Sequence, residues 1–112
     1  RNIDSIHEET FTNYSKTVFL MLNNNNLTRL DSPDIFKGLT NLKNLHLNRN
    51  QLTSINENVF NNLVKLEVLS LKSNRIQSIH VRTFENLSDL KELSLSNNKL
   101  NELDSKLFIN LA

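Results

Sequence analysis

Three histidines, His7, His46 and His80, are the side chains of this sequence best suited to hold a metal ion. The sequence repeats itself about every 24 residues, and His7 and His80 occupy equivalent places three repeats apart. At the spacing of stacked strands, three repeats separate two side chains by on the order of 14 Å, too far for a shared ion. His46 falls on the opposite face of its repeat. We therefore predict no metal site.

The residue types and their spacing give little indication of any other catalytic chemistry. The chain has no cysteine, which excludes disulfides, thiolate metal sites and cysteine nucleophiles within these residues. No nucleophile–base pair, phosphate-cradling glycine loop or pair of carboxylates recurs at a useful spacing. The loop carboxylates look solvated; they are Asp31, Asp34, Glu57 and Glu85. We expect neither an enzyme nor a cofactor.

Three Asn-x-Ser/Thr triplets could accept N-linked glycans in a secreted protein. They begin at Asn13, Asn26 and Asn86. Two of them, Asn13 and Asn86, follow a repeated phenylalanine by two residues, on the expected outer edge. The alternative is chance, because the chain contains 20 Asn. We predict glycosylation at these three positions and keep that alternative open.

The elements that position these groups come from the repeat itself. From Leu42, each unit carries Leu at its first, fourth and sixth places, Asn at the ninth, Leu or Ile at the eleventh and fourteenth, and Phe at the nineteenth. A period of this size predicts a solenoid, whose units bury their apolar sides against each other. The chain forms one array, with a partial repeat at 1–16 and repeats at 17–41, 42–65, 66–89 and 90–112.

Alternation within each unit predicts a short β-strand. In Asn44–Leu47, Val68–Leu71 and Glu92–Leu95 the leucines point to one face and the intervening residues to the other. Each strand is too short to stand alone, so the strands should stack in parallel over a leucine core. We expect short parallel strands on the concave face and mostly loops or short helical turns on the convex face.

Two further columns hold the units together in this prediction. A buried Asn amide both donates and accepts, so it can satisfy backbone groups of its own and the adjacent turn. The predicted corner asparagines are Asn25, Asn50, Asn74 and Asn98. A column of phenylalanines should stack ring on ring in the return segments. Its members are Phe11, Phe36, Phe60, Phe84 and Phe108.

These positions follow the pattern LxxLxLxxNxLxxLxxxxFxxLxx, and the chain resembles the extracellular, 24-residue class of leucine-rich repeats over its whole length. It is similar to ectodomains of Toll-like receptors and related insect immune proteins, jawless-vertebrate lymphocyte receptors and matrix proteoglycans. The resemblance implies a curved, right-handed α/β-type solenoid in an extracellular or cell-surface protein. The family's cysteine-rich end caps are absent, so we expect an internal fragment of a longer ectodomain.

The concave face is the expected binding surface, because its outward side chains differ from repeat to repeat while the residues of the scaffold stay the same. Phe19 and Met21 make a natural apolar anchor there; the alternative is that they pack on residues before Arg1 or are scattered surface side chains. The outward strand positions are Phe19, Met21, Asn23, Asn44, His46, Asn48, Val68, Ser70, Lys72, Glu92, Ser94 and Ser96, and Asn24, Arg49, Ser73 and Asn97 extend the rows.

Composition and charge restrict the classes of partner that we expect this chain to bind. A net charge of +1 and a pI near 8.3 give no broad electrostatic footprint for nucleic acid or an anionic membrane. No apolar run of membrane-spanning length exists, so we expect no membrane insertion within this segment. The resemblance implies a protein or other macromolecular ligand and allows a homodimer or heterodimer. The leading function is recognition in an innate-immune receptor of the Toll-like kind; the alternative is a structural or adhesive matrix protein without signalling.

Overall fold

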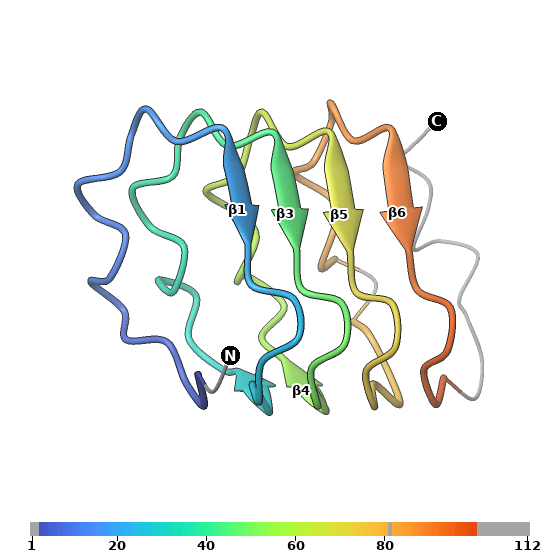
Figure 1. Cartoon of the computed structure of the whole chain (residues 1–112). Coiled ribbons are helices and arrows are strands. Elements are labelled where there is room, and N and C mark those ends of the chain that lie inside the picture. Colours follow the sequence, from blue (N-terminus) through green and yellow to red (C-terminus); the bar gives the residue numbers. More distant parts are fainter. Residues whose placement is uncertain (1–2, 81, 101–112) are drawn as a thin grey trace.

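A computed structural model describes residues 3–80 and 82–100 of the chain, and the predicted column member Phe108 lies outside them. Six short strands occur in order: β1 (Phe19–Met21), β2 (Arg29–Leu30), β3 (Asn44–His46), β4 (Ser54–Ile55), β5 (Val68–Ser70) and β6 (Glu92–Ser94). The segments between them are turns and loops, with no helix in the described ranges. The expected solenoid fold is confirmed, and its return segments are turns (Figure 1).

The main sheet has four parallel strands in the order β1-β3-β5-β6. Leu20 pairs with Leu45, Leu45 with Leu69, and Leu69 with Leu93, so each unit stacks on the next without slippage. A slip of one residue would turn the leucines out to water, which the burial of Leu45 and Leu69 opposes. Figure 1 shows the four strands side by side and pointing the same way.

Backbone hydrogen bonds continue this sheet past the strand ends. The amides of Leu22, Leu47 and Leu71 donate to the carbonyls of His46, Ser70 and Ser94, at 2.8, 2.9 and 2.9 Å. Two residues later, the amide of Arg49 donates to the carbonyl of Lys72 at 3.0 Å. The ladder therefore holds each turn in register up to the corner.

A second, two-stranded parallel sheet pairs β2 with β4, Leu30 lying beside Ile55. Side chains around Asp31 reinforce it, because Ser54 Oγ donates to Asp31 Oδ1 at 2.9 Å and Asn56 Nδ2 donates to the Asp31 carbonyl at 2.9 Å. This sheet was not predicted from the sequence. It links the return segments of the first two full repeats.

The core lies between the main sheet and the return segments. Fully buried leucines from the strands meet a column of phenylalanine rings, in which Phe11, Phe36, Phe60 and Phe84 stack at centroid distances of 6.2, 6.1 and 6.0 Å. Interplanar angles of 21°, 9° and 17° make this a continuous offset stack. Burial of each such side chain stabilises the fold by roughly 1.5–3 kcal/mol.

The corner asparagines lock successive turns together. Asn50 Nδ2 donates to the carbonyl of Leu22 in the preceding turn at 2.9 Å and to that of Leu47 in its own turn at 3.0 Å. Its Oδ1 accepts from the amide of Leu27 at 3.1 Å. Asn74 and Asn98 repeat this pattern, and Asn25 makes its own-turn part of it and accepts from Ile3.

The residue before each corner asparagine has a left-handed backbone. Asn24, Arg49, Ser73 and Asn97 have φ of 60°, 60°, 61° and 58°. Only glycine adopts this region freely, and asparagine tolerates it, so an arginine and a serine there carry local strain. The turn that brings each asparagine amide into the core requires this conformation.

The single glycine, Gly38, fills a different need. It lies in the 25-residue repeat, has a φ of 101°, and a Cβ added there would come within 2.4 Å of the Phe11 carbonyl oxygen. No side chain fits at that distance. Gly38 therefore permits close packing of this longer repeat against the partial one before it.

Candidate ligand-binding face

The solvent-facing side of the main sheet is the concave side expected from the sequence, and we call it the sheet face. Strand pairing arranges its outward residues in two cross-strand rows. The first row is Phe19, Asn44, Val68 and Glu92, and the second is Met21, His46, Ser70 and Ser94. Neighbours within a row lie on strands about 4.8 Å apart, so four turns together form one surface.

Exposure along these rows is uneven. Phe19 and Met21 are 64% and 63% exposed, whereas His46, Val68 and Ser70 in the middle of the sheet are half-buried. At the far edge Glu92 and Ser94 are exposed. The sheet face therefore runs from an apolar strand, through a mixed centre, to an acidic and hydroxyl-bearing strand.

A groove of about 640 Å³ lies over β3, β5 and β6. Leu69 and Leu93 form its floor, and polar groups of His46, Asn48 and Ser70 line it together with Lys91 and Glu92. Beside the groove, Lys91 Nζ lies 3.9 Å from Glu67 Oε1, both on the rim where the strands begin. The groove offers donors, acceptors and one apolar wall from Val68, a mixture suited to a polar ligand with some apolar surface.

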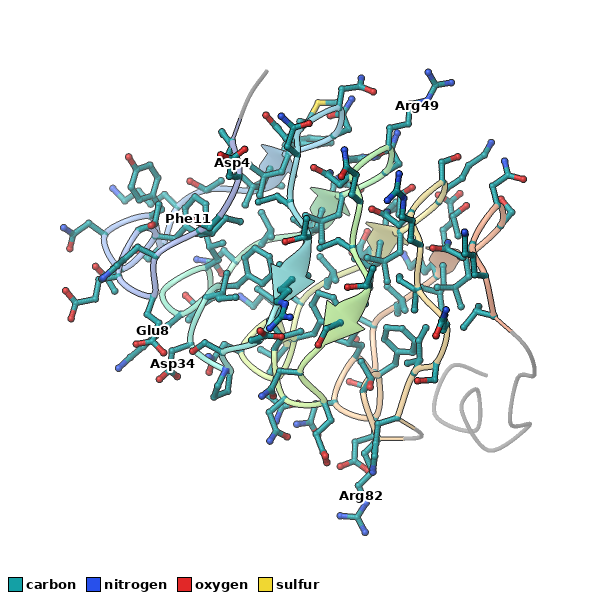
Figure 2. The ribbon with its side chains drawn as sticks, turned by 90° about the horizontal axis from the view of Figure 1, so that it is seen from below. Asp4, Glu8, Phe11, Asp34, Arg49 and Arg82 are labelled. Carbon is teal, nitrogen blue, oxygen red and sulfur yellow. The ribbon has the colours of Figure 1, made fainter. Side chains whose placement is uncertain are left out.

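The remaining predicted face residues lie where the strands end. Asn23 lines a second hollow with Met21 and Ile3, of about 510 Å³. Lys72 and Arg49 are exposed, and Arg49 projects from the edge of the molecule (Figure 2). These residues flank the rows. Of the flanking residues, Asn48 alone lines the groove over β3, β5 and β6.

The histidines have separate surroundings. His7 Nδ1 accepts from the amide of Glu9 at 3.3 Å, and His80 Nδ1 accepts from the amide of Arg82 at 3.1 Å. Each thus closes a small turn on the return side, while His46 belongs to the sheet face. Glu57 Oε2 lies 3.7 Å from His80 Nδ1, the nitrogen that accepts the hydrogen bond from the Arg82 amide. No group of three or more potential metal ligands occurs in 3–80 and 82–100.

The three predicted glycan acceptors are all on the surface. Asn13, Asn26 and Asn86 are exposed. Asn26 lies next to the buried corner residue Asn25, and its backbone amide donates to the Ile3 carbonyl of the partial repeat at 2.9 Å. Exposure meets the steric requirement for modification and leaves glycosylation a prediction.

One buried polar atom was missed by the sequence reading. Thr83 Oγ1 is buried and has no hydrogen-bond partner in the described part of the chain. The equivalent residues of the two preceding repeats are Val59 and Ile35, both buried and apolar. The signal was present in the sequence as a hydroxyl at a place that is apolar in the two preceding full repeats, although Thr10 occupies it, exposed, in the partial repeat.

Parallel strands, an asparagine column and a varied outer face define a solenoid recognition module. The family model described as "Leucine rich repeat" matches residues 20–76 and 64–112, which together make up most of the chain. The chain belongs to the leucine-rich repeat family.

Comparison with solved structures supports the same conclusion. The chain is similar to the leucine-rich repeat domain of APL1B, known from a crystal structure, with a TM-score of 0.87 and 30% sequence identity. The match covers 94% of this chain and 32% of that one, so the chain spans about a third of the length of this relative. Among curated proteins no match was found. Within the described residues no helix is long and apolar enough to cross a membrane.

Proposed function

We propose that this chain is the recognition segment of a secreted or cell-surface receptor, of the innate-immune kind that its repeat class resembles. It binds a macromolecular ligand, in the first place a protein, through the sheet face. The family is a protein-interaction module, which supports the general role. The similarity to the extracellular class of leucine-rich repeats supports the receptor context and the extracellular location.

One observation carries the proposal: two large apolar side chains are exposed to solvent on a strand that is paired with its neighbour. Phe19 and Met21 are each more than three-fifths exposed, yet their strand is fixed by pairing with β3. Aromatic and methionine side chains are enriched in the centres of protein interfaces and are costly to leave exposed. The half-buried groove lined by His46 and Ser70 continues this surface with hydrogen-bonding groups.

The test is a double substitution, Phe19→Ser with Met21→Ser, in the full-length protein that contains this chain. Binding to a co-purified partner should fall at least tenfold, since hot-spot side chains of this type each contribute about 1 kcal/mol or more. A matched control is Tyr14→Ser with Val64→Ser, which removes two exposed apolar side chains away from the sheet face. Equal affinity for the wild type and the Phe19/Met21 variant would refute the anchor.

A further inference from the structure

The corner of the solenoid, where the strands end, has an unusual distribution of charge. Four exposed cations lie there on three consecutive turns: Arg49, Lys72, Arg75 and Lys99. From the central strand leucine to the end of the corner, no repeat contains an aspartate or glutamate; these segments are 20–28, 45–53, 69–77 and 93–100. We call this surface the cationic edge.

Backbone hydrogen bonds place these four residues in two pairs on adjacent turns. The amide of Arg49 donates to the carbonyl of Lys72 at 3.0 Å, so the two occupy adjacent turns at the same level. The amides of Arg75 and Lys99 donate to the eleventh-place carbonyls of their preceding turns at 2.9 and 3.0 Å, which puts both in one column. The cationic edge therefore consists of two pairs, and the members of each pair lie on adjacent turns about 4.8 Å apart along the solenoid axis.

None of the four cations is neutralised within the described ranges. The three contacts between a basic and an acidic side chain there join Arg29 to Asp31, Lys91 to Glu67, and His80 to Glu57. Glu92, at the start of its strand, is four residues and about 13 Å from the corner. Figure 2 shows Arg49 on the opposite side of the molecule from Glu8 and Asp34.

The surroundings of the cationic edge favour a hydrophilic ligand. Its other side chains are amides and hydroxyls, including Asn48, Gln51 and Ser96. Of the large exposed apolar side chains of the described residues, Met21 alone falls in a corner segment, 20–28, and that turn carries none of the four cations. A folded protein partner requires an apolar centre, and a single-stranded nucleic acid requires aromatic platforms for its bases. The three corner segments that carry the cations have no exposed large apolar side chain and no Phe, Tyr or Trp.

We infer that the cationic edge binds a linear sulfated polysaccharide. Such a polymer carries closely spaced anions that match these paired cations, and hydroxyls that match the amides between them. The inference goes beyond the proposed function, because it gives the same module a second ligand, bound by residues other than Phe19 and Met21. A net charge of only +1 would not produce this binding, whereas local segregation of charge does.

The test measures binding of a short heparin oligosaccharide at several salt concentrations. With four contacts, and the coefficient of duplex DNA of about 0.9 per contact, affinity should fall about 10²-fold between 50 and 200 mM salt. The variant R49Q/K72Q/R75Q keeps one contact, so its affinity at the lower salt concentration should be strongly reduced and should then fall only about threefold to fourfold.

A charge-matched control separates local placement from net charge. The variant K16Q/K37Q/R82Q removes three exposed cations that lie outside the cationic edge, and it should bind the oligosaccharide like the wild type. Equal loss of binding in the two triple variants would overturn the inference. Tighter binding of duplex DNA or of polyglutamate than of the oligosaccharide would also overturn it. Because Phe19 and Met21 are unchanged in these variants, failure here leaves the proposed function standing.

Discussion

Replacement of Asn74 by aspartate isolates the donor half of the corner amide. Asn74 is 6% exposed. Its Nδ2 donates to the carbonyls of Leu47 and Leu71, both at 3.0 Å, and shares one of these hydrogens with the Lys72 carbonyl at a longer 3.3 Å. Its Oδ1 accepts from the amide of Leu52 at 3.1 Å. An ionised aspartate of almost the same shape keeps the acceptor and loses both donated bonds.

The size of the effect follows from these contacts. Two lost hydrogen bonds correspond to about 1–3 kcal/mol. The two carbonyls are not left without partners, since Leu47 also accepts from Asn50 and Leu71 also accepts from Asn98. In addition, the buried carboxylate lies against these carbonyl oxygens and has no hydrogen to donate to them, which is unfavourable. We expect Asn74→Asp to lower the free energy of unfolding by about 2–4 kcal/mol at neutral pH.

The loss should depend on pH with a definite sign. Burial beside carbonyl oxygens disfavours the charged form, so the pKa of the new carboxyl is raised above its unfolded value of about 3.9. The folded variant then binds more protons than its unfolded chain, and the deficit is smallest below about pH 4 and grows as the pH rises.

Urea denaturation of the wild type and the variant at several pH values measures this deficit. The control is Asn86→Asp, the same chemical change at an exposed position, which should alter stability by no more than about 0.5 kcal/mol. A variant as stable as the wild type, or a deficit independent of pH, would refute the donor role of the amide.

Three other substitutions test the packing and the backbone. Thr83→Val removes the buried hydroxyl without a partner and should raise the free energy of unfolding by about 1–2 kcal/mol in urea denaturation; a decrease would show that the hydroxyl is satisfied. Gly38→Ala should lower it by about 2–4 kcal/mol, because the new Cβ meets the Phe11 carbonyl and φ is 101°; near-wild-type stability in thermal unfolding would contradict this contact. Ser73→Asn places a residue that tolerates the left-handed region at a φ of 61° and should add about 0.5–1 kcal/mol; the same change at Ser94, on a strand, should add nothing.

The parts of the fold that were predictable are those in which one position needs one type of side chain. Leu45 and Leu69 are buried in register because alternation within a strand leaves only one inward face. Asn50 and Phe60 are equally specified, since few other residues supply a donor and acceptor at a corner, or a ring in a stack. The repeat period turned these local rules into a whole architecture.

The backbone conformation at the corner was not predictable, because the types of the residues there do not indicate it. A glycine in the sequence usually indicates a left-handed backbone position, but here Arg49 and Ser73 have the left-handed conformation. Their conformation is imposed by the ladder on one side and by the buried asparagine that follows on the other. Pairing of β2 with β4 was missed for a similar reason, since a two-residue strand carries no periodicity of its own.

The charge pattern of the surface required both levels of information. Arg49, Lys72 and Arg75 lie up to 26 residues apart in the sequence, among carboxylates that bring the net charge close to zero. Only when equivalent places of successive turns are superimposed do the cations gather at one corner, with acids such as Asp31 and Glu57 on the return side. In a solenoid, the ligand meets a column of positions contributed by several repeats, and total charge says little about it. The heparin experiment, in which two variants share one net charge and differ only in placement, therefore tests this principle together with the site.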